Sequence, residues 1–289
     1  MKDRQRLLVI GNGMAGARAV EEILARGGGE RLDITMFGDE PYGNYNRILL
    51  SNVLNGAQDL HDIFLNPLDW YAENGITLHA GVRVTRIDRD CKSLRDDRGR
   101  SFAYDKLIIA TGSRPFVPPI DGLESVEGAG KPGVFVFRTI DDCARIAGYA
   151  DKCRKAVVIG GGLLGLEAAR GLMNYGVEVH VVHNVGWLMN NQLDQDGGAV
   201  LKAAMERMGV QVHLDTSIVR VLGAESVRGV AFRTGDALDC DMVVISAGIT
   251  PNTEIARECG LAVERAIVVN DRMQSIGDPD IYVVGECAQ

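Results

Sequence analysis

Two stretches of this chain show the same succession of apolar and polar positions. Residues 7–10 are all apolar, and small or apolar residues then recur at helical spacing up to residue 24. Residues 156–159 form a second apolar run, and an amphipathic stretch from Leu163 to Tyr175 follows it. Short apolar runs are typical of buried strands, and a period of about 3.6 residues is typical of helices that pack on one face. The pattern therefore predicts two strand–helix units, one at the N-terminus and one in mid-chain.

The rest of the pattern completes an α/β chain. Strands are predicted at 32–37, within 104–115, and at 178–183, 210–214, 218–223, 227–233, 242–246 and 281–284, and helices near 140–150 and 197–208. Residues 76–98 alternate between apolar and polar side chains, which predicts a small antiparallel meander. Trp70 and Tyr71 are expected in the core. Prolines 115, 118 and 119 make a stiff extended segment that marks a domain boundary.

Each of the two apolar runs leads into a glycine motif, G-x-G-x-x-G, which spans Gly11–Gly16 in the first case and Gly160–Gly165 in the second. In such a turn the first glycine permits the bend, the second lets a pyrophosphate approach the backbone, and the third lets the helix pack against the strand. The helix N-terminus then offers N–H donors to the phosphates. One motif alone is also compatible with plain packing, but two copies predict two nucleotide sites.

Candidate contacts to the nucleotides come after each strand–helix unit. Asp39, or else Glu40, follows the second strand, where a carboxylate can accept hydrogen bonds from ribose hydroxyls. Arg47 is a candidate for the pyrophosphate, or else a surface arginine. In the mid-chain unit His183 stands where a ribose-binding acid is expected, and no arginine for a 2′-phosphate is near it in the sequence. The choice between NADH and NADPH is therefore open.

Composition and charge narrow the class of protein. A net charge of −8 argues against a nucleic-acid partner and against binding to an anionic membrane surface. No apolar run approaches the roughly 20 residues that a membrane-spanning helix needs. The six cysteines include no C-x-x-C pair, and no cysteine–histidine cluster has metal-ligand spacing. We therefore expect reduced thiols, no metal site and a cytoplasmic location.

Five motifs, taken together, carry a resemblance to a known family. They are Gly11-x-Gly13-x-x-Gly16, Ala110-Thr111-Gly112, Gly160-x-Gly162-x-x-Gly165-x-Glu167, Gly248-x-x-Pro251-Asn252 and Gly285-Glu286. In this combination the chain resembles the FAD- and NAD(P)H-binding reductases of the pyridine nucleotide–disulfide oxidoreductase superfamily. The resemblance implies a glutathione-reductase-like α/β fold of two Rossmann-like, three-layer ββα nucleotide-binding domains. Residues 1–120 with 246–289 are then expected to form a discontinuous FAD-binding domain, and residues 122–245 an inserted NAD(P)H-binding domain.

The resemblance also implies which residues bind FAD and NADH or NADPH. The expected cofactor-binding residues are Gly11, Gly13, Met14, Ala15, Gly16, Asp39, Glu40, Arg47, Ala110, Thr111, Gly112, Arg114, Gly160, Gly162, Leu163, Leu164, Gly165, Glu167, His183, Gly248, Gly285 and Glu286. Glu167 matches a glutamate that lies near the nicotinamide. Glu286 stands where the family usually has an aspartate that bonds the ribityl chain or its phosphate.

Within the superfamily, several stretches are similar to the N-terminal flavin module of the NAD(P)H-dependent nitrite reductase large subunit. They are Tyr45-Asn46-Arg47-Ile48-Leu49-Leu50-Ser51, Asp69-Trp70-Tyr71, Val182-His183, Leu188-Met189 and Gln192-Leu193-Asp194, together with the first glycine motif. In that family iron–sulfur and sirohaem domains follow the module. The chain is therefore expected to be a truncated piece that lacks the C-terminal interface domain.

The activity that this resemblance implies is hydride transfer from NAD(P)H to FAD, followed by electron transfer to downstream iron–sulfur and sirohaem centres for nitrite reduction. No residue of this chain is expected to act as a catalytic acid, base or metal ligand. Two alternatives stay open: a rubredoxin- or ferredoxin-type NAD(P)H reductase that reduces a small redox protein, and a non-catalytic nucleotide-binding sensor on the same fold.

Overall fold

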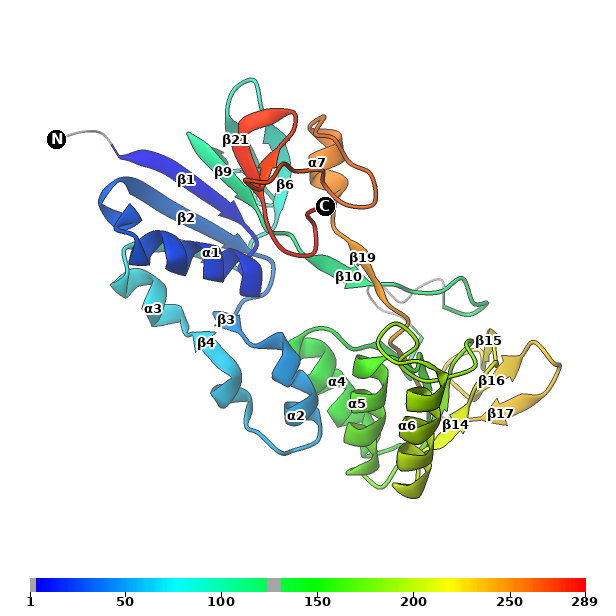
Figure 1. The fold of residues 1–289 in the computed structure, drawn as a ribbon. Helices are drawn as coiled ribbons and strands as arrows, with labels where there is room; N and C mark the ends of the chain where they lie inside the picture. The colour runs from blue at the N-terminus through cyan, green and yellow to red at the C-terminus, as the bar shows by residue number, and fades with distance from the viewer. Residues whose placement is uncertain (1–3, 124–130) are drawn as a thin grey trace. The chain divides into compact units, whose positions relative to one another are not determined.

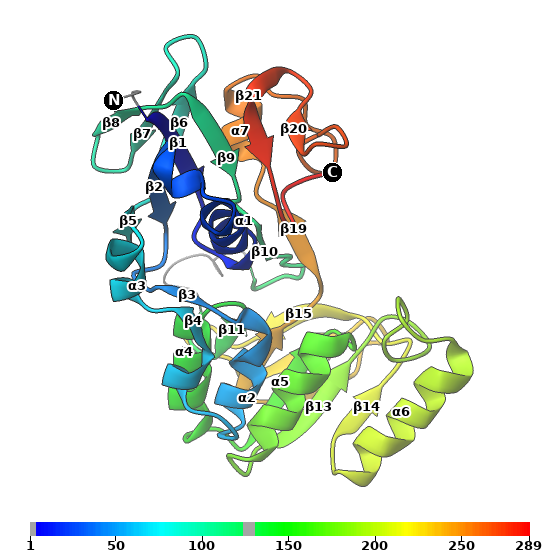
Figure 2. The ribbon, with the colours of Figure 1, turned by 60° about the vertical axis from the view of Figure 1, so that its left-hand side comes forward.

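The computed structural model describes residues 4–123 and 131–289, and it divides into two compact units (Figures 1 and 2). The first unit comprises Met1–Asn46, Phe64–Arg114 and Thr250–Gln289, and the second comprises Arg47–Ile63 and Pro115–Ile249. Residues 1–3 and 124–130 of the predicted domains lie outside the described residues. The second unit is thus inserted into the first twice, and it takes residues 47–63, which the sequence assigns to the first domain.

A six-stranded sheet forms the centre of the first unit, in the order β20-β21-β9-β1-β2-β5. Its strands are β1 Gln5–Ile10, β2 Leu32–Gly38, β5 Ile76–Ala80, β9 Lys106–Ile109, β20 Gln274–Ser275 and β21 Asp278–Val283. All neighbours pair in parallel except β20 and β21, which are antiparallel. The sequence predicts a return strand near the C-terminus, and β21 pairs with β9 in this sheet.

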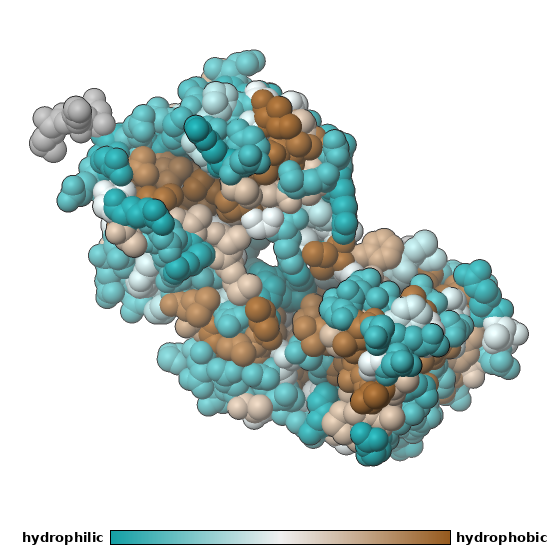
Figure 3. All heavy atoms as spheres, in the orientation of Figure 1, coloured by the Kyte–Doolittle hydropathy of each residue, from teal (hydrophilic) through white to brown (hydrophobic). Residues whose placement is uncertain are grey.

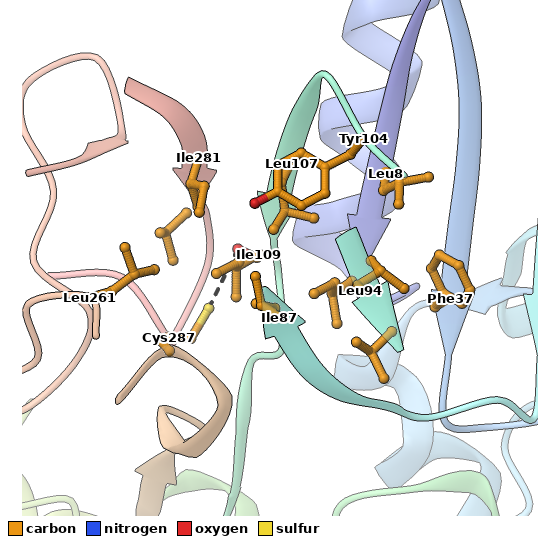
Figure 4. Packing of buried hydrophobic residues seen from close by; sticks show 14 of the residues in the cluster. Leu8, Phe37, Ile87, Leu94, Tyr104, Leu107, Ile109, Leu261, Ile281 and Cys287 are labelled. Carbon is orange, nitrogen blue, oxygen red and sulfur yellow. Dashed lines mark hydrogen bonds between the residues drawn. The ribbon is translucent and has the colours of Figure 1, made fainter. Parts of the chain in front are cut away.

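The two faces of this sheet bury alternate side chains of each strand, as the two-residue period of a strand requires. Leu7 and Val9 of β1 pack on the face that carries helices α1 (Met14–Ala25) and α3 (Leu68–Glu73). Leu8 and Ile10 pack on the opposite face, shown in Figure 4. That face is covered by the antiparallel strands β6 Val84–Asp88, β7 Ser93–Asp96 and β8 Ser101–Ala103 and by the short helix α7 Glu254–Glu258. The unit therefore has three layers.

The first half of the predicted meander belongs to the main sheet. Ile76 and Leu78 lie in β5, which pairs in parallel with β2, so a single meander over 76–98 is wrong. The physical reason is burial on one side only: an edge strand of a parallel sheet shows the same alternation as a strand of a half-exposed meander. The meander consists of β6, β7 and β8.

The second unit repeats the three-layer plan. Its five-stranded sheet is parallel throughout, in the order β11-β18-β12-β13-β14. The strands are β11 Val134–Val136, β12 Lys155–Ile159, β13 Glu178–Val182, β14 Gln211–His213 and β18 Met242–Ile245. Helices α4 Ile140–Ala150, α5 Leu163–Met173 and α6 Gln195–Arg207 contact this sheet. The other face is buried by the antiparallel strands β15 Ile218–Leu222, β16 Gly229–Phe232 and β17 Ala237–Asp239.

The segment 47–63 packs on the helices of the second unit. It consists of η2 Arg47–Leu49, α2 Leu50–Leu54 and η3 Leu60–Ile63. Leu54 of α2 is fully buried, and a Cβ on Gly171 of α5 would lie 2.9 Å from its side chain. The missing side chain at Gly171 therefore lets α2 approach α5 closely. Nothing in the local pattern of residues 47–63 indicates this partner, because the contact is made over more than a hundred residues of sequence.

The remaining strands are short. β3 Asn44–Tyr45 pairs with β4 Phe64–Asn66, and β10 Ser113–Pro115 pairs with β19 Ile249–Pro251, where the chain passes between the units. Apolar side chains reach the surface in separate patches on an otherwise mostly hydrophilic face (Figure 3). In the part of the chain that the structure describes, no helix is both long and apolar enough to cross a membrane.

Candidate cofactor-binding sites

The first glycine turn joins β1 to α1, and its three glycines have different surroundings. At Gly11 the backbone φ is +112°, and a Cβ would lie 2.1 Å from the carbonyl oxygen of Ala110. At Gly16 a Cβ would lie 2.2 Å from the carbonyl oxygen of Gly11. At Gly13 no atom of the described residues lies within 4 Å of the Cβ position. Packing therefore requires the first and third glycines, whereas the space beside the second is open to a ligand.

The second glycine turn joins β12 to α5 and repeats these surroundings. Gly160 has φ +118°, and a Cβ there would lie 2.1 Å from the carbonyl oxygen of Ser246. A Cβ at Gly165 would lie 2.1 Å from the carbonyl oxygen of Gly160, while the Cβ position at Gly162 has no neighbour within 4 Å among residues 4–123 and 131–289. Two turns in separate units thus keep the same position free. Such a cradle is what a bound pyrophosphate requires, so the residues present fit one dinucleotide at each turn.

The helices that follow are also open at their N-termini. Gly13 caps α1 and Gly162 caps α5, and neither helix has a side-chain cap or an acidic residue in its first turn. Their first N–H groups therefore have no intrahelical or side-chain acceptor and can bind an anion. Leu163 and Leu164 begin α5 with 53% and 37% of their surfaces exposed.

The Ala110-Thr111-Gly112 turn is tied to Asn252 within the first unit. The hydroxyl of Thr111 donates to the carbonyl oxygen of Asn252, the amide of Asn252 donates to the carbonyl oxygen of Thr111, and both distances are 2.8 Å. The backbone N–H of Asn252 donates to the carbonyl oxygen of Gly112 at 2.9 Å. Arg114 donates to the Asn252 side chain at 3.1 Å and pairs with Glu254 at 2.8 Å. These bonds fix the backbone beside Gly11.

Gly112 and Gly248 occupy matching places, three residues after the ends of β9 and β18. Both have positive φ, +63° and +116°, and in the part of the chain that the structure describes nothing lies within 4 Å of either Cβ position. Gly112 thus follows β9, the neighbour of β1, in the first unit, and Gly248 follows β18, the neighbour of β12, in the second unit. The match extends the likeness of the two units beyond the glycine motifs themselves.

Glu286 lies beside the first glycine turn. Gly285 has φ +82°, and a Cβ there would lie 2.7 Å from the Cβ of Ala15 in the first turn of α1. The hydroxyl of Ser113 donates to a carboxylate oxygen of Glu286 at 2.7 Å. Ser113 was not identified from the sequence, although it directly follows the Ala-Thr-Gly motif. The predicted contact of Glu286 with the flavin stays a prediction.

Both candidate ribose acids lie at the carboxyl end of β2. Asp39 pairs with Arg83 at 2.9 Å. Desolvation raises the pKa of Asp39, and Arg83 offsets part of the rise. Glu40 accepts a hydrogen bond from the hydroxyl of Tyr45 at 2.7 Å. The geometry favours neither acid over the other as the ribose contact.

Arg47 belongs to the second unit, where it begins η2 and donates to the carbonyl oxygen of Arg138 at 3.0 Å. The sequence assigns it to the first domain and to the flavin pyrophosphate. The domain assignment differs from the structure because residues 47–63 pack on α4 and α5. Its role toward the pyrophosphate stays a prediction.

Hydrogen bonds of the buried Tyr71 hydroxyl and of Asn12 support the first glycine turn. The hydroxyl of Tyr71 donates to Oδ1 of Asn12 at 2.7 Å and accepts from the backbone N–H of Asn44 at 3.1 Å. The Asn12 amide donates to the carbonyl oxygen of Tyr42 at 3.3 Å. Tyr71 is 1% exposed, so the core position expected from the sequence is confirmed, but its hydroxyl also holds the variable residue of the glycine motif. A tyrosine at an apolar-periodic position gives no signal of this second role.

In the second unit, one oxygen of Glu167 is buried and has no hydrogen-bond partner among the described residues. Buried carboxylate oxygens are rarely left without a donor, so this atom is suited to a ligand that brings one. His183 is 9% exposed, and its ring contacts the glycine turn itself, through the N–H of Gly161. The place of His183 directly after a strand in the sequence does not indicate that its ring contacts the backbone of the glycine turn.

The six cysteines are all free thiols. Burial raises the pKa of Cys143 to about 11 and that of Cys240 to about 12, so neither is poised as a thiolate. Among residues 4–123 and 131–289, no cluster of histidine, cysteine and acidic residues has the arrangement of a metal site.

The chain matches the pyridine nucleotide-disulphide oxidoreductase family over residues 5–289. It is 46% identical to the assimilatory nitrate reductase electron transfer subunit of Bacillus subtilis, covering 99% of this chain and 36% of that protein. It is 40% identical to the nitrite reductase (NADH) large subunit of Escherichia coli, covering 98% of this chain and 33% of that protein. The chain thus spans about a third of the length of these relatives.

Among solved structures, the putidaredoxin reductase–putidaredoxin complex matches with a TM-score of 0.90 and 29% identity, over 98% of this chain and 68% of the matched chain. An NAD-dependent persulfide reductase from A. fulgidus matches with a TM-score of 0.91 and 28% identity, over 98% of this chain and 53% of that one. The family match covers nearly every residue and agrees with the two glycine turns and the two three-layer units. The chain belongs to the pyridine nucleotide-disulphide oxidoreductase family, the FAD- and NAD(P)H-dependent oxidoreductases that its motifs predict.

Proposed function

We propose that this chain is the flavin reductase module of an assimilatory nitrite or nitrate reductase, which takes electrons from NAD(P)H and passes them through FAD to a downstream redox centre. The observation that supports this most is the pair of glycine turns, each with the space beside its middle glycine free. The relatives named nitrite reductase and nitrate reductase electron transfer subunit support the assignment to nitrite or nitrate reduction. The free cysteines favour a cytoplasmic location.

The first unit is the FAD-binding domain in this proposal. The N–H groups after Gly13 bind the pyrophosphate, and Asp39 or Glu40 accepts hydrogen bonds from the adenosine ribose. Glu286 accepts from the ribityl hydroxyls, and Ser113 orients its carboxylate. Glutamate carries one methylene more than aspartate, so a fixed orientation matters more here for reaching a hydroxyl at hydrogen-bond distance.

The second unit is the NAD(P)H-binding domain. The N–H groups after Gly162 bind its pyrophosphate, and the buried oxygen of Glu167 accepts from the nicotinamide end of the coenzyme. When bound, FAD supplies the redox chemistry, because it accepts a hydride and releases electrons singly. The residues of this chain supply binding and orientation, and no side chain is assigned a proton-transfer step.

A second acceptor class has its own support. The structural likeness to the reductase in the putidaredoxin complex, and to an NADH:rubredoxin oxidoreductase at 27% identity and a TM-score of 0.81, favours a small separate redox protein as the acceptor. In both cases the reaction of this chain is the same. Only the next centre differs: an iron–sulfur or sirohaem domain of a longer protein, or a separate partner.

Anaerobic stopped-flow absorbance tests the proposal. The protein is loaded with FAD and mixed with NADH and, separately, with NADPH, and flavin bleaching is followed. We expect reduction within the turnover time of typical enzymes, on the order of a second or less. Adding a ferredoxin or rubredoxin then tests reoxidation by a small partner. Bound FAD that neither coenzyme bleaches would contradict the proposal and favour a nucleotide-binding sensor.

A further inference from the structure

His183 follows β13, and both nitrogens of its buried ring are engaged. Nδ1 accepts the backbone N–H of Gly161 at 3.2 Å, and Nε2 lies 3.1 Å from Oδ1 of Asn190. A backbone N–H can only donate, so Nδ1 carries no proton. The proton is then on Nε2, which donates to the amide oxygen of Asn190. This pair of bonds requires the neutral imidazole in its Nε2–H form.

The loop after His183 also binds Gly161, through its carbonyl oxygen. The N–H of Met189 donates to the carbonyl oxygen of Gly161 at 2.9 Å, and Met189 has φ 52°, a conformation that few residues other than glycine adopt. A Cβ on Gly161 would lie 2.7 Å from the side chain of Leu188 and 2.8 Å from the His183 ring. Both polar backbone groups of Gly161 are therefore bound by residues 183–189, and Gly161 directly precedes the open position at Gly162.

We propose that His183 is a positioning residue whose neutral imidazole holds the second glycine turn in its pyrophosphate-binding shape, and that protonation of the ring weakens binding of the pyridine nucleotide. The inference rests on the proposed function of the second unit. A protonated Nδ1 becomes a donor and faces the N–H of Gly161, donor against donor. The bond is then lost when the ring takes up a proton. One hydrogen bond of this kind corresponds to about three- to tenfold in affinity.

Other titratable groups lie near the loop, but in the described residues none of them is a hydrogen-bond partner of His183. Nδ1 of His180 lies 2.9 Å from Nε2 of His213, and Nε2 of His180 lies 2.8 Å from Glu178. The carboxylate of Asp215, after β14, lies 3.2 Å from the Cβ position of Gly186 in the loop. His183 itself makes no ion pair in the described ranges. Any pH dependence that remains without an imidazole at 183 belongs to these groups.

Two neutral substitutions separate the two contacts of the ring. H183N places its amide oxygen where Nδ1 lies, so the N–H of Gly161 keeps an acceptor. H183Q extends its amide toward Asn190 and leaves the N–H of Gly161 without one. Neither side chain titrates, and the two variants serve as matched controls for each other.

Binding of NAD⁺ to the FAD-loaded chain is measured by calorimetry between about pH 8 and about pH 5.5. NAD⁺ is the probe because it lacks the titrating 2′-phosphate of NADP⁺. We expect wild type to lose about three- to tenfold in affinity on acidification. H183N should keep the wild-type affinity of pH 8 throughout, and H183Q should bind weakly throughout. An H183N variant that weakens with acid as wild type does, or an H183Q variant that binds as tightly as wild type at pH 8, overturns the inference.

A measurement without ligand separates this inference from the proposed function. Nitrogen NMR of ¹⁵N-labelled protein should show the Nε2–H form of His183 at about pH 8, and the Gly161 amide should shift as the ring takes up a proton. If NAD⁺ binds at no pH, the proposed function of the second unit fails, and the spectrum still decides the role of His183. An Nδ1–H form, or a Gly161 amide that is indifferent to protonation of His183, contradicts it.

Discussion

Two glycines of the first turn, two residues apart, should respond in opposite ways to the same substitution. In Gly11→Ala the new Cβ lies 2.1 Å from the carbonyl oxygen of Ala110, on a backbone with φ +112°. Backbone strain of about 1–3 kcal/mol and overpacking of about 1–3 kcal/mol together predict a loss of about 2–6 kcal/mol in the free energy of unfolding. Part of the first unit should unfold at lower urea concentration.

In Gly13→Ala the new Cβ meets none of the described residues within 4 Å, on a backbone with φ −77° and ψ −178° that any residue adopts. Stability should be unchanged, or higher by about 0.4–1 kcal/mol, because alanine restricts the unfolded chain. The methyl group instead occupies the space assigned to the pyrophosphate. FAD affinity should therefore fall by at least about tenfold, which is about 1.4 kcal/mol.

The assay combines urea denaturation with titration of FAD fluorescence. Gly162→Ala is the matched control, because Gly162 has the same extended backbone and free Cβ position but lies in the other unit. Its stability should likewise be unchanged or slightly higher, and its FAD affinity should equal that of wild type. Equal destabilisation by Gly11→Ala and Gly13→Ala, or wild-type FAD affinity in Gly13→Ala, would show that the two glycines do not have these different roles.

Three further predictions concern stability. Tyr71→Phe should lower the free energy of unfolding by about 1–3 kcal/mol, because it leaves buried partners of the hydroxyl unsatisfied. Tyr104→Phe should be nearly neutral, because its equally buried hydroxyl has no partner in the described residues. The hydrogen bond from Arg6 lowers the pKa of Asp105 to about 2. At pH values above the unfolded carboxyl pKa of about 4, this pair should therefore contribute at most about 1 kcal/mol to the free energy of unfolding. This contribution should be lost as the pH falls toward 2. Leu54→Ala should destabilise the second unit by about 2–5 kcal/mol.

Each of these has a direct check. Urea midpoints at neutral pH compare the two tyrosine variants, and equal losses would contradict the network at the glycine turn. Asp105→Asn should abolish its share of the acid-induced loss, and an unchanged pH profile would show that the pair contributes nothing. Hydrogen exchange of amides in α4 and α5 follows Leu54→Ala, and faster exchange confined to the first unit would contradict the packing of residues 47–63.

The glycine turns could be predicted because their requirements are local. The strand, the bend with positive φ and the helix that packs close to the strand are all encoded within about 15 consecutive residues. Both copies are present, and the predicted glycines occupy the positions where a side chain would clash. The strands that contribute fully buried runs, such as β9 and β18, were predictable for the same reason.

The features that sequence analysis missed depend on contacts between distant segments. Residues 47–63 pack on α4 and α5, and Gly171 of α5, more than a hundred residues from Leu54 in the sequence, makes room for α2. Ser113 reaches Glu286 and Thr111 reaches Asn252 only because β9 pairs with β21 and β10 pairs with β19 in the folded chain. His183 has the position of a ribose ligand in the sequence, but its ring turns toward Gly161. Side-chain direction is set by packing and is not written in strand periodicity.

In the proposed function the two glycine turns hold two different nucleotides, FAD in the first unit and NAD(P)H in the second. Equilibrium binding of FAD and of NAD⁺ to Gly13→Ala and Gly162→Ala tests this assignment. We predict a crossed result, in which Gly13→Ala loses FAD affinity and keeps NAD⁺ affinity while Gly162→Ala does the reverse. Loss of the same ligand in both variants, or no change in either, would contradict the assignment.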